Sequence, residues 1–196
     1  MKRIHRGMAL ALSAVLLLLT AAPSAWAAEN TITIETAQDL AELSKNCSLD
    51  SWSQGKTVLL AGDIDLTGTD FRPIPTFGGT FDGQGHTISG LLVTGNGNVQ
   101  GLFRYVQVGG VVQDLSVRGT VSPTDFRDTA GGIVGSNRGQ LLRCTFQGTV
   151  KGESSVGGIA GINEAEGRLI NCTFSGLVEG NLHVGGIAGQ NLGGVI

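Results

Sequence analysis

The chain has 196 residues, 32 of them glycine, with a formal net charge of −3 at pH 7 and three cysteines. This length allows one domain with a hydrophobic core. Three cysteines argue against a disulfide-built scaffold, and the acidic balance argues against the clustered lysine and arginine that nucleic-acid binding requires.

The first 28 residues differ from the rest and predict an export signal. A basic start is followed by an uncharged apolar run, Met8 to Ala22, and then by small residues. This order is typical of a cleaved signal peptide, and the 15-residue run is shorter than the ~20 residues that span a bilayer. Cleavage after Ala27 or Ala28 leaves 10 basic and 16 acidic residues, a net charge of about −6. We therefore expect a secreted or cell-surface protein with no membrane span after signal removal.

Residues 29–56 predict a cap on the domain. Thr36 followed by Asp39 is close to the capping-box form of a helix start, and the apolar spacing predicts a short helix over Ala37–Lys45. The next segment, Thr57–Leu66, is predicted as a strand. A stack of strands needs its first edge covered, because an open edge invites pairing with another chain.

The glycines after the signal segment recur at fixed places. Three segments with the pattern Gly-Gly-Ile-x-Gly-x-Asn begin at Gly131, Gly157 and Gly185, with spacings of 26 and 28 residues. An insertion at Ala165-Glu166 accounts for the difference. Self-similarity at a fixed period of this length indicates a repeat architecture.

An apolar block with steps of 3, 2, 2 and 2 residues follows the first two openings. It consists of Leu141, Cys144, Phe146, Gly148 and Val150, and again of Leu169, Cys172, Phe174, Gly176 and Val178. The same steps fit earlier blocks that begin at Val112 and at Ile88. Steps of 2 keep side chains on one face of a strand, so both phenylalanines are predicted to point inward, and the step of 3 marks a bulge or corner.

Such a unit cannot bury its apolar face alone, and no helical pattern of useful length lies between the strands. Stacked copies give parallel strands ~4.8 Å apart. We predict an all-β fold: a right-handed parallel β-helix (β-solenoid) with a short N-terminal capping helix, since parallel connections are overwhelmingly right-handed. The coils are assigned to residues 57–196. We expect truncation at the C-terminus, with a longer chain or another chain covering the last coil.

Stacking places equivalent side chains in columns along the solenoid axis. Asn137, Asn163 and Asn191 are predicted to form a ladder of side-chain amides. Cys144 is predicted to lie over Cys172. Two buried thiols are favoured over a disulfide, because in-register side chains point the same way.

Two segments resemble the GLUG repeat of bacterial secreted and surface proteins: Gly-Gly-Ile-Val-Gly-Ser-Asn (131–137) and Gly-Arg-Leu-Ile-Asn-Cys-Thr-Phe-Ser-Gly-Leu-Val (167–178). Such proteins include adhesin-like proteins and the non-catalytic parts of IgA-specific metallopeptidases. Residues 77–91 resemble the leading coil of pectin-lyase-like β-helices. Arg143 departs from the pattern, because asparagine is usual before the cysteine. The resemblance implies the fold and says little about activity.

Few residues could carry chemistry. His86 lies near Arg72 and near Asp63, Asp65 and Asp82 in the sequence, and the resemblance implies that carbohydrate-active β-helices use such residues on one exposed face. Glycosidic hydrolysis needs two carboxylates at a defined separation, which nothing in the sequence establishes. The favoured interpretation is that the aspartates form turns beside glycines. A cluster on one outward face would favour an enzyme, and separate turns would favour a binding module.

The other candidates have structural interpretations. His183 is interpreted as a solvated loop residue. Most of the aromatic residues of the first half are interpreted as core or cap rather than as a sugar platform: Trp52, Phe71, Phe77, Phe81, Phe103 and Tyr105. No His-Glu-x-x-His motif, phosphate-binding loop or calcium-binding nonapeptide occurs. We therefore assign no catalytic, cofactor-binding or metal residue, and expect no cofactor.

The sequence predicts a non-catalytic exported repeat module of a bacterial surface or secreted protein. It would present a solenoid face for adhesion or ligand binding, or act as a spacer. The alternatives are a polysaccharide-active β-helix lyase or hydrolase and the non-catalytic part of a secreted metallopeptidase. The expected partners are a surface ligand, such as a glycan or a host protein, and further domains of a longer chain, but not nucleic acid.

Overall fold

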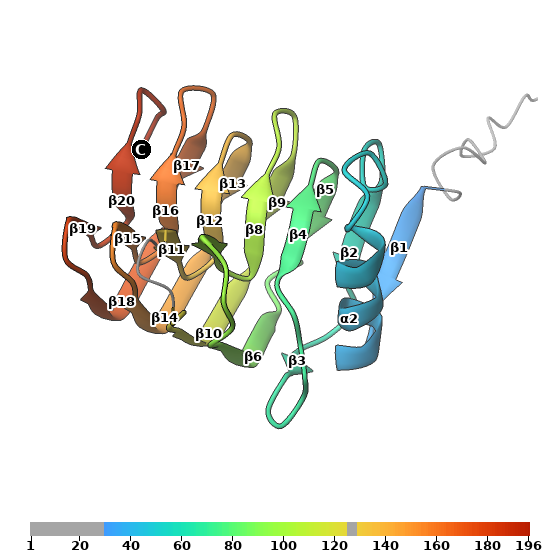
Figure 1. Cartoon of the computed structure of the whole chain (residues 1–196). Coiled ribbons are helices and arrows are strands. Elements are labelled where there is room, and N and C mark those ends of the chain that lie inside the picture. The colour runs from blue at the N-terminus through green and yellow to red at the C-terminus, as the bar shows by residue number, and fades with distance from the viewer. Residues whose placement is uncertain (1–29, 125–128) are drawn as a thin grey trace, which may run out of the picture.

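The computed structural model describes residues 30–124 and 129–196, which wind into a parallel β-solenoid with one short helix (Figure 1). Successive turns pair in parallel throughout the described part. The predicted signal segment, residues 1–28, lies outside the described residues. Across 30–124 and 129–196, none of the helical structure is long and apolar enough to span a membrane. The predicted all-β solenoid is confirmed.

The strands form four sheets, here named A to D, and each full turn passes through them in the order A, B, D, C. Sheet A contains β1 (Thr31–Ile34), β2 (Thr57–Leu60), β5 (Thr80–Asp82), β9 (Val111–Gln113), β13 (Gln140–Leu142) and β17 (Arg168–Ile170). Sheet B contains β3 (Ile64–Asp65), β6 (Thr87–Val93), β10 (Ser116–Val121), β14 (Thr145–Lys151) and β18 (Thr173–Glu179). Sheet C contains β4 (Ile74–Phe77), β8 (Phe103–Val106), β12 (Val134–Asn137), β16 (Ala160–Asn163) and β20 (Ala188–Asn191). Sheet D contains β7 (Val99–Gln100), β11 (Thr129–Gly131), β15 (Ser155–Gly157) and β19 (His183–Gly185).

Helix α2, Ala37–Asn46, packs beside β4 and β1 at the N-terminal end of the solenoid (Figure 1). It begins with the predicted capping box. The Thr36 hydroxyl accepts from the Asp39 backbone N–H at 3.2 Å, and the Asp39 carboxylate accepts from the Thr36 backbone N–H at 2.9 Å. The Ser44 hydroxyl donates to the carbonyl oxygen of Arg72 at 2.9 Å and so ties the helix to the segment that leads into β4. The predicted capping helix is confirmed.

The single strand predicted over residues 57–66 is wrong. The chain forms β2 and then β3, with a corner at residues 61–63. β2 belongs to sheet A, where Val58 pairs with Phe81, whereas Ile64 of β3 pairs with Ile88 in sheet B. A continuous apolar pattern can therefore cross a corner of the solenoid, because both flanking strands bury side chains in the same core.

The blocks that begin at Leu141 and Leu169 lie in register as predicted. Phe146 pairs with Phe174 and Val150 with Val178. The block that begins at Val112 continues the same columns, since Val112 pairs with Leu141. The stretch from sheet A through sheet B has the same length in these three turns, so equal sequence steps there correspond to equal places in the coil.

The block that begins at Ile88 was aligned wrongly from the sequence. Ile88 pairs with Val117 of the next turn, whereas the predicted steps set it opposite Val112. Phe81 occupies that place instead. A bulge at Gly90, with φ 69°, puts one extra residue into β6 between Ile88 and Leu91. Their step of 3 therefore lies within one strand and only imitates the step of 3 that marks the corner in the other blocks.

The solenoid interior is filled by aliphatic and phenylalanine side chains. Phe103 packs against Phe77 and Phe81 with ring centroids 5.4 Å apart in both pairs, and all three rings are buried. Phe146 stacks on Phe174 with centroids 6.3 Å apart. The interpretation of these phenylalanines as core residues is confirmed. In the last turn, whose C-terminal side no described strand covers, Phe174 is only partly buried.

Candidate functional site

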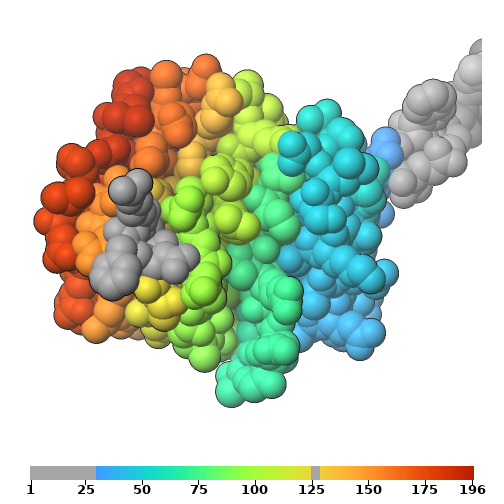
Figure 2. All heavy atoms as spheres, viewed as in Figure 1, coloured from blue at the N-terminus to red at the C-terminus, as the bar shows by residue number. Residues whose placement is uncertain are grey.

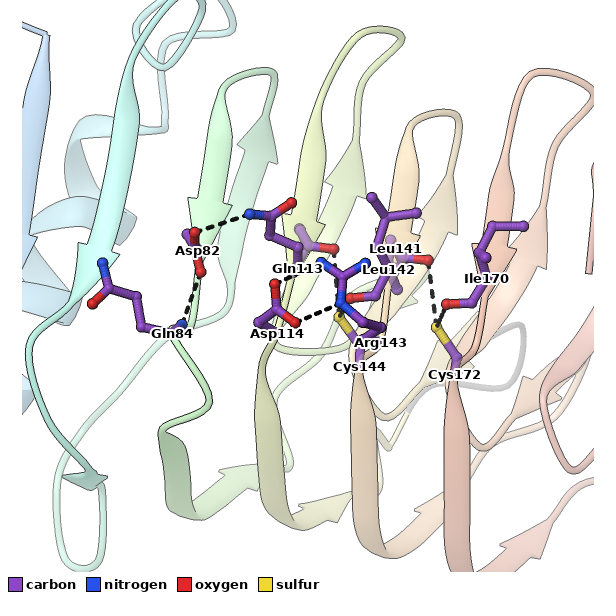
Figure 3. A network of polar contacts seen from close by, with 11 residues as sticks. Asp82, Gln84, Gln113, Asp114, Leu141, Leu142, Arg143, Cys144, Ile170 and Cys172 are labelled. Carbon is purple, nitrogen blue, oxygen red and sulfur yellow. Dashed lines mark hydrogen bonds and ion pairs between the residues drawn. The ribbon is translucent and has the colours of Figure 1, made fainter. Parts of the chain in front are cut away.

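Four successive turns pass from sheet A to sheet B through a residue with left-handed backbone. These residues are Gln84, Asp114, Arg143 and Asn171, with φ between 51° and 54°. Asparagine and aspartate enter this region far more readily than other side chains with a Cβ. This explains why asparagine is usual at the place that Arg143 occupies. The corner is thus primarily a structural element, and Figure 3 shows the side chains of Gln84, Asp114 and Arg143 at this corner in three successive turns.

Arg143 reaches back along this column to the preceding turn. Its Nε and Nη2 atoms donate to the two carboxylate oxygens of Asp114 at 2.6 and 2.7 Å (Figure 3). These hydrogen bonds hold the pKa of the Asp114 carboxyl below its ordinary value. One turn earlier, Asp82 accepts from the backbone N–H of Gln84 at 2.8 Å and from the side-chain amide of Gln113 at 2.9 Å. The bonds from Gln113 to Asp82 and from Arg143 to Asp114 connect consecutive turns. Both carboxylates are thus occupied by these structural hydrogen bonds.

The group of His86, three aspartates and Arg72 is divided among separate corners. His86 Nδ1 lies 3.5 Å from Asp63 Oδ1, but the same oxygen accepts from the first backbone N–H of β6 at 2.8 Å. Asp65 accepts from the backbone N–H two residues further on, at 2.9 Å, within its own turn. Arg72 precedes β4 and lies near α2. The turn-forming interpretation is confirmed for Asp65 and Asp82, whereas Asp63 bonds to the next turn.

His183 was predicted to lie in a loop, and that placement is wrong. It lies in the short strand β19, where it pairs with Ser155 and remains exposed. Its Nδ1 atom is 2.7 Å from Nε2 of Gln190. Three-residue strands bounded by glycine on one side are hard to distinguish from loops in a single sequence.

All three cysteines are free thiols. Cys144 is buried and Cys172, one turn later, is half-buried; the latter donates to the carbonyl oxygen of Leu141 at 3.5 Å (Figure 3). Contact with Cys172, together with burial, raises the pKa of Cys144, and the same contact lowers the pKa of Cys172. Burial also raises the pKa of Cys47, to about 11. The prediction of free thiols rather than a disulfide is confirmed, but only Cys144 of the pair is fully buried.

The asparagine ladder is also confirmed. Asn137 Nδ2 donates to Asn163 Oδ1 at 2.9 Å, and Asn163 Nδ2 donates to Asn191 Oδ1 at 3.0 Å. Asn137 and Asn163 are fully buried, and each also donates to a backbone carbonyl in the following turn segment, Gly139 or Gly167. At the turn from sheet C to sheet A, the Oδ1 atom of Asn137 also accepts from the backbone N–H of Gly139 at 3.1 Å, a buried group that needs a hydrogen-bond partner.

A groove that the sequence did not reveal opens beside α2, on the side of the molecule turned to the viewer in Figure 2. Its volume is about 930 Å³. It is lined by residues of α2 and its C-terminal end, by residues 69–73 before β4, and by residues 92–96 at the end of β6 and just after it. Arg72 and Phe71 were noted in the sequence for other reasons, whereas Lys45, Gln100 and Arg104 were missed. These side chains come from different turns, so no spacing pattern connects them.

A second hollow of about 640 Å³ shares Pro75 and Arg104 with this groove and continues across sheet C. Tyr105 lies there and is 42% exposed, unlike the phenylalanines of the core. Arg138 marks its far end and pairs with Glu166 at 3.7 Å. Among residues 30–124 and 129–196, no group of three histidine, cysteine or acidic side chains is arranged to hold a metal ion. Together the two hollows bring charged, aromatic and hydrogen-bonding groups onto one concave surface.

Comparison with known proteins agrees with the fold. Residues 152–178 match the family model for the GLUG motif. The structure is a β-helix, and this segment of it matches the GLUG motif. It is 32% identical over 131 residues to halomucin from Haloquadratum walsbyi, an alignment that covers 58% of this chain and 1% of halomucin.

A crystal structure provisionally described as an immunoglobulin A1 protease from Bacteroides ovatus has a similar fold. The TM-score is 0.54 at 19% identity, and the match covers 81% of this chain and 61% of that protein. At this identity the similarity concerns the fold alone. The chain thus spans about a hundredth of halomucin and less than two thirds of the structural neighbour.

Proposed function

We propose that this chain is a non-catalytic, exported repeat module of a surface or secreted protein, and that its solenoid face binds a ligand outside the cell. The observation that carries the proposal is that the polar side chains at the corners pair with side chains of the neighbouring turn. Asp82, Asp114 and Arg143 connect one turn to the next rather than meeting at one point where a reaction could occur. A polar ladder of this kind stabilises a long, regular surface.

The location outside the cell has two independent supports. The GLUG match and the similarity to halomucin are consistent with a surface or secreted protein. The first 28 residues have the order of a signal peptide. The ligand is proposed to be a glycan or a host protein, and the same regular stack of turns can hold another domain away from the cell.

The second candidate is a polysaccharide-active enzyme, and the observation that favours it is the contact between His86 and Asp63. A histidine beside a carboxylate can act as a general base. Against this role, Asp63 Oδ1 already accepts a backbone N–H, and glycoside hydrolysis needs a second carboxylate at a defined distance across the sugar. Asp65 is turned into its own loop by a backbone hydrogen bond.

Two measurements test the proposal. The tagged chain is expressed in a bacterial host, and we expect it in the medium or on the surface, accessible to added protease, with a mature N-terminus at Ala28 or Glu29. Retention in the cytoplasm would contradict export. Incubation with a panel of polysaccharides should release no reducing ends and no unsaturated products. Turnover that disappears in Asp63→Asn would instead establish the enzyme.

A further inference from the structure

The groove beside α2 gathers cations on a protein that is acidic overall. Lys45, Arg72 and Arg104 line it, and Asp70 is the only carboxylate among the lining residues. The whole chain has a net charge of −3. Three of its basic residues therefore line one hollow, although they come from the end of α2, the corner before β4 and the strand β8.

No described carboxylate lies within ion-pair distance of these three cations. By contrast, Arg138, Arg143 and Lys151 each form an ion pair elsewhere on the solenoid. Cations held close together in a concave site repel one another, and an anion between them removes that repulsion. The groove therefore has the electrostatic character of an anion-binding site.

Part of the groove is rigidly positioned. Arg104 Nε donates to the carbonyl oxygen of Val99 at 3.0 Å, which holds the guanidinium group against the wall. The Ser44 hydroxyl fixes the backbone at Arg72 from the side of α2. Groups that are held in place before a ligand arrives lose little conformational entropy when it binds.

The groove also offers neutral polar and aromatic surface. Gln100 is 4% exposed, and its Oε1 atom is buried without a hydrogen-bond donor. Such an acceptor is costly unless a donor reaches it. Beyond the shared Arg104, the exposed ring of Tyr105 provides an apolar face of the kind on which sugars pack.

We propose that this groove binds an acidic glycan, with carboxylate or sulfate groups between Lys45, Arg72 and Arg104, and with sugar hydroxyls and ring faces toward Gln100 and Tyr105. An acidic glycan alternates anionic groups with neutral, hydroxyl-rich rings, as this surface alternates cations with amide and aromatic groups. The inference rests on the proposed binding function and names its ligand class and its site. Duplex nucleic acid, with a charge on every phosphate, does not match three cations on an acidic protein.

The test measures binding by isothermal titration calorimetry with the purified protein. The probes are polygalacturonate, its methyl ester, dextran sulfate and poly-glutamate. The groove variant is Lys45→Gln with Arg72→Gln. The matched control is Arg118→Gln with Arg168→Gln, which removes the same charge from exposed positions on sheets B and A.

We expect polygalacturonate or dextran sulfate to bind, the methyl ester to bind at least tenfold more weakly, and high salt to weaken binding. The groove variant should lose about tenfold in affinity or more, since charge-assisted hydrogen bonds are the strong ones, while the control pair changes it less than about twofold. Comparing the affinities for polygalacturonate and dextran sulfate shows whether the groove prefers the carboxylate groups or the sulfate groups of an acidic glycan.

An equal loss in the two double variants would overturn the proposal, because it would mean non-specific charge attraction. Binding of poly-glutamate alone, or of no polysaccharide, would overturn it too. Circular dichroism of both double variants shows whether the fold is kept. If the groove variant is unstable, the single variant Arg72→Ala replaces it, and its affinity for the polysaccharide is measured in the same way. Failure in these titrations leaves export and lack of turnover untouched, so the two proposals fail separately.

Discussion

Replacing Asn163 by alanine should destabilise the solenoid more than any change at its exposed neighbour in the asparagine ladder. Asn163 is fully buried, accepts from Asn137 at 2.9 Å, and donates to Asn191 at 3.0 Å and to the carbonyl oxygen of Gly167 at 3.3 Å. Alanine removes the whole amide and all of these hydrogen bonds.

The magnitude follows from these contacts. A buried hydrogen bond contributes about 1 kcal/mol net, and each partner left unsatisfied costs about 1–3 kcal/mol. Asn137 keeps its bond to the Gly139 carbonyl, and the Gly167 carbonyl still accepts from the Val195 backbone N–H at 2.9 Å. The cost is therefore the loss of the hydrogen bonds that the Asn163 amide itself makes, to Asn137, Asn191 and the backbone carbonyls. We expect Asn163→Ala to lower the free energy of unfolding by about 2–4 kcal/mol. Asn191→Ala, at the exposed end of the same ladder, should cost about 1 kcal/mol or less.

Equilibrium unfolding in urea, followed by circular dichroism, measures both variants against the parent. Trp52 fluorescence reports separately on the N-terminal turns, because Trp52 packs beside the cap. Repeat proteins can lose terminal turns first, so the loss for Asn163→Ala should appear in the dichroism signal before it appears in the fluorescence. The reasoning is refuted if Asn163→Ala costs no more than Asn191→Ala, or if the cost stays below about 0.5 kcal/mol, the range of ordinary surface changes.

Three further predictions test other parts of the structure. Gly148→Ala should prevent soluble folding or cost several kcal/mol, because φ is 151° and a Cβ would meet a backbone oxygen of the preceding turn. As the control, Gly62→Ala places a Cβ in open space and should change the free energy of unfolding by less than about 0.5 kcal/mol in the same urea titration. Asp114→Asn should remove a small acid-sensitive part of the stability. The pKa of Asp114 is lowered in the folded state, so its contribution to stability is present above the ordinary carboxyl pKa and is lost as pH falls through the folded pKa. Equal unfolding midpoints for variant and parent at pH 7 and at pH 3 would contradict this. At pH 8, Cys172 should react with iodoacetamide well before Cys144, because the pKa of Cys172 is lowered and its side chain is half-buried rather than buried. Peptide mass spectrometry measures the two labelling rates, and faster labelling of Cys144 would contradict the prediction.

The repeat region could be predicted almost completely from the sequence. The columns of Phe146 over Phe174 and of Asn137 over Asn163 follow from two facts: identical units stack, and side chains alternate with period 2 along a strand. A shift of one residue would turn every buried side chain outward, so only one register buries the phenylalanines. The reduced state of Cys144 follows from the same geometry.

Prediction was less successful where turn lengths vary. The bulge at Gly90 gave Ile88 and Leu91 a step of 3 that imitates the corner step, and the corner at residues 61–63 divided a segment that had the pattern of one strand. Both errors have one cause: the apolar pattern records which side chains are buried, but not how many residues the backbone uses to turn a corner.

The sequence by itself determined the class of fold, the helical cap and the columns of the repeat, because each depends on local propensity or on equal spacing between identical units. Only the tertiary structure decided which polar residues meet. His86 lies beside Asp63 but apart from Arg72, and Arg72 instead lies with Lys45 and Arg104. Neighbours on the side of a solenoid are a full turn apart in the chain, and where turn lengths differ, the closure of each turn in space decides which residues become neighbours.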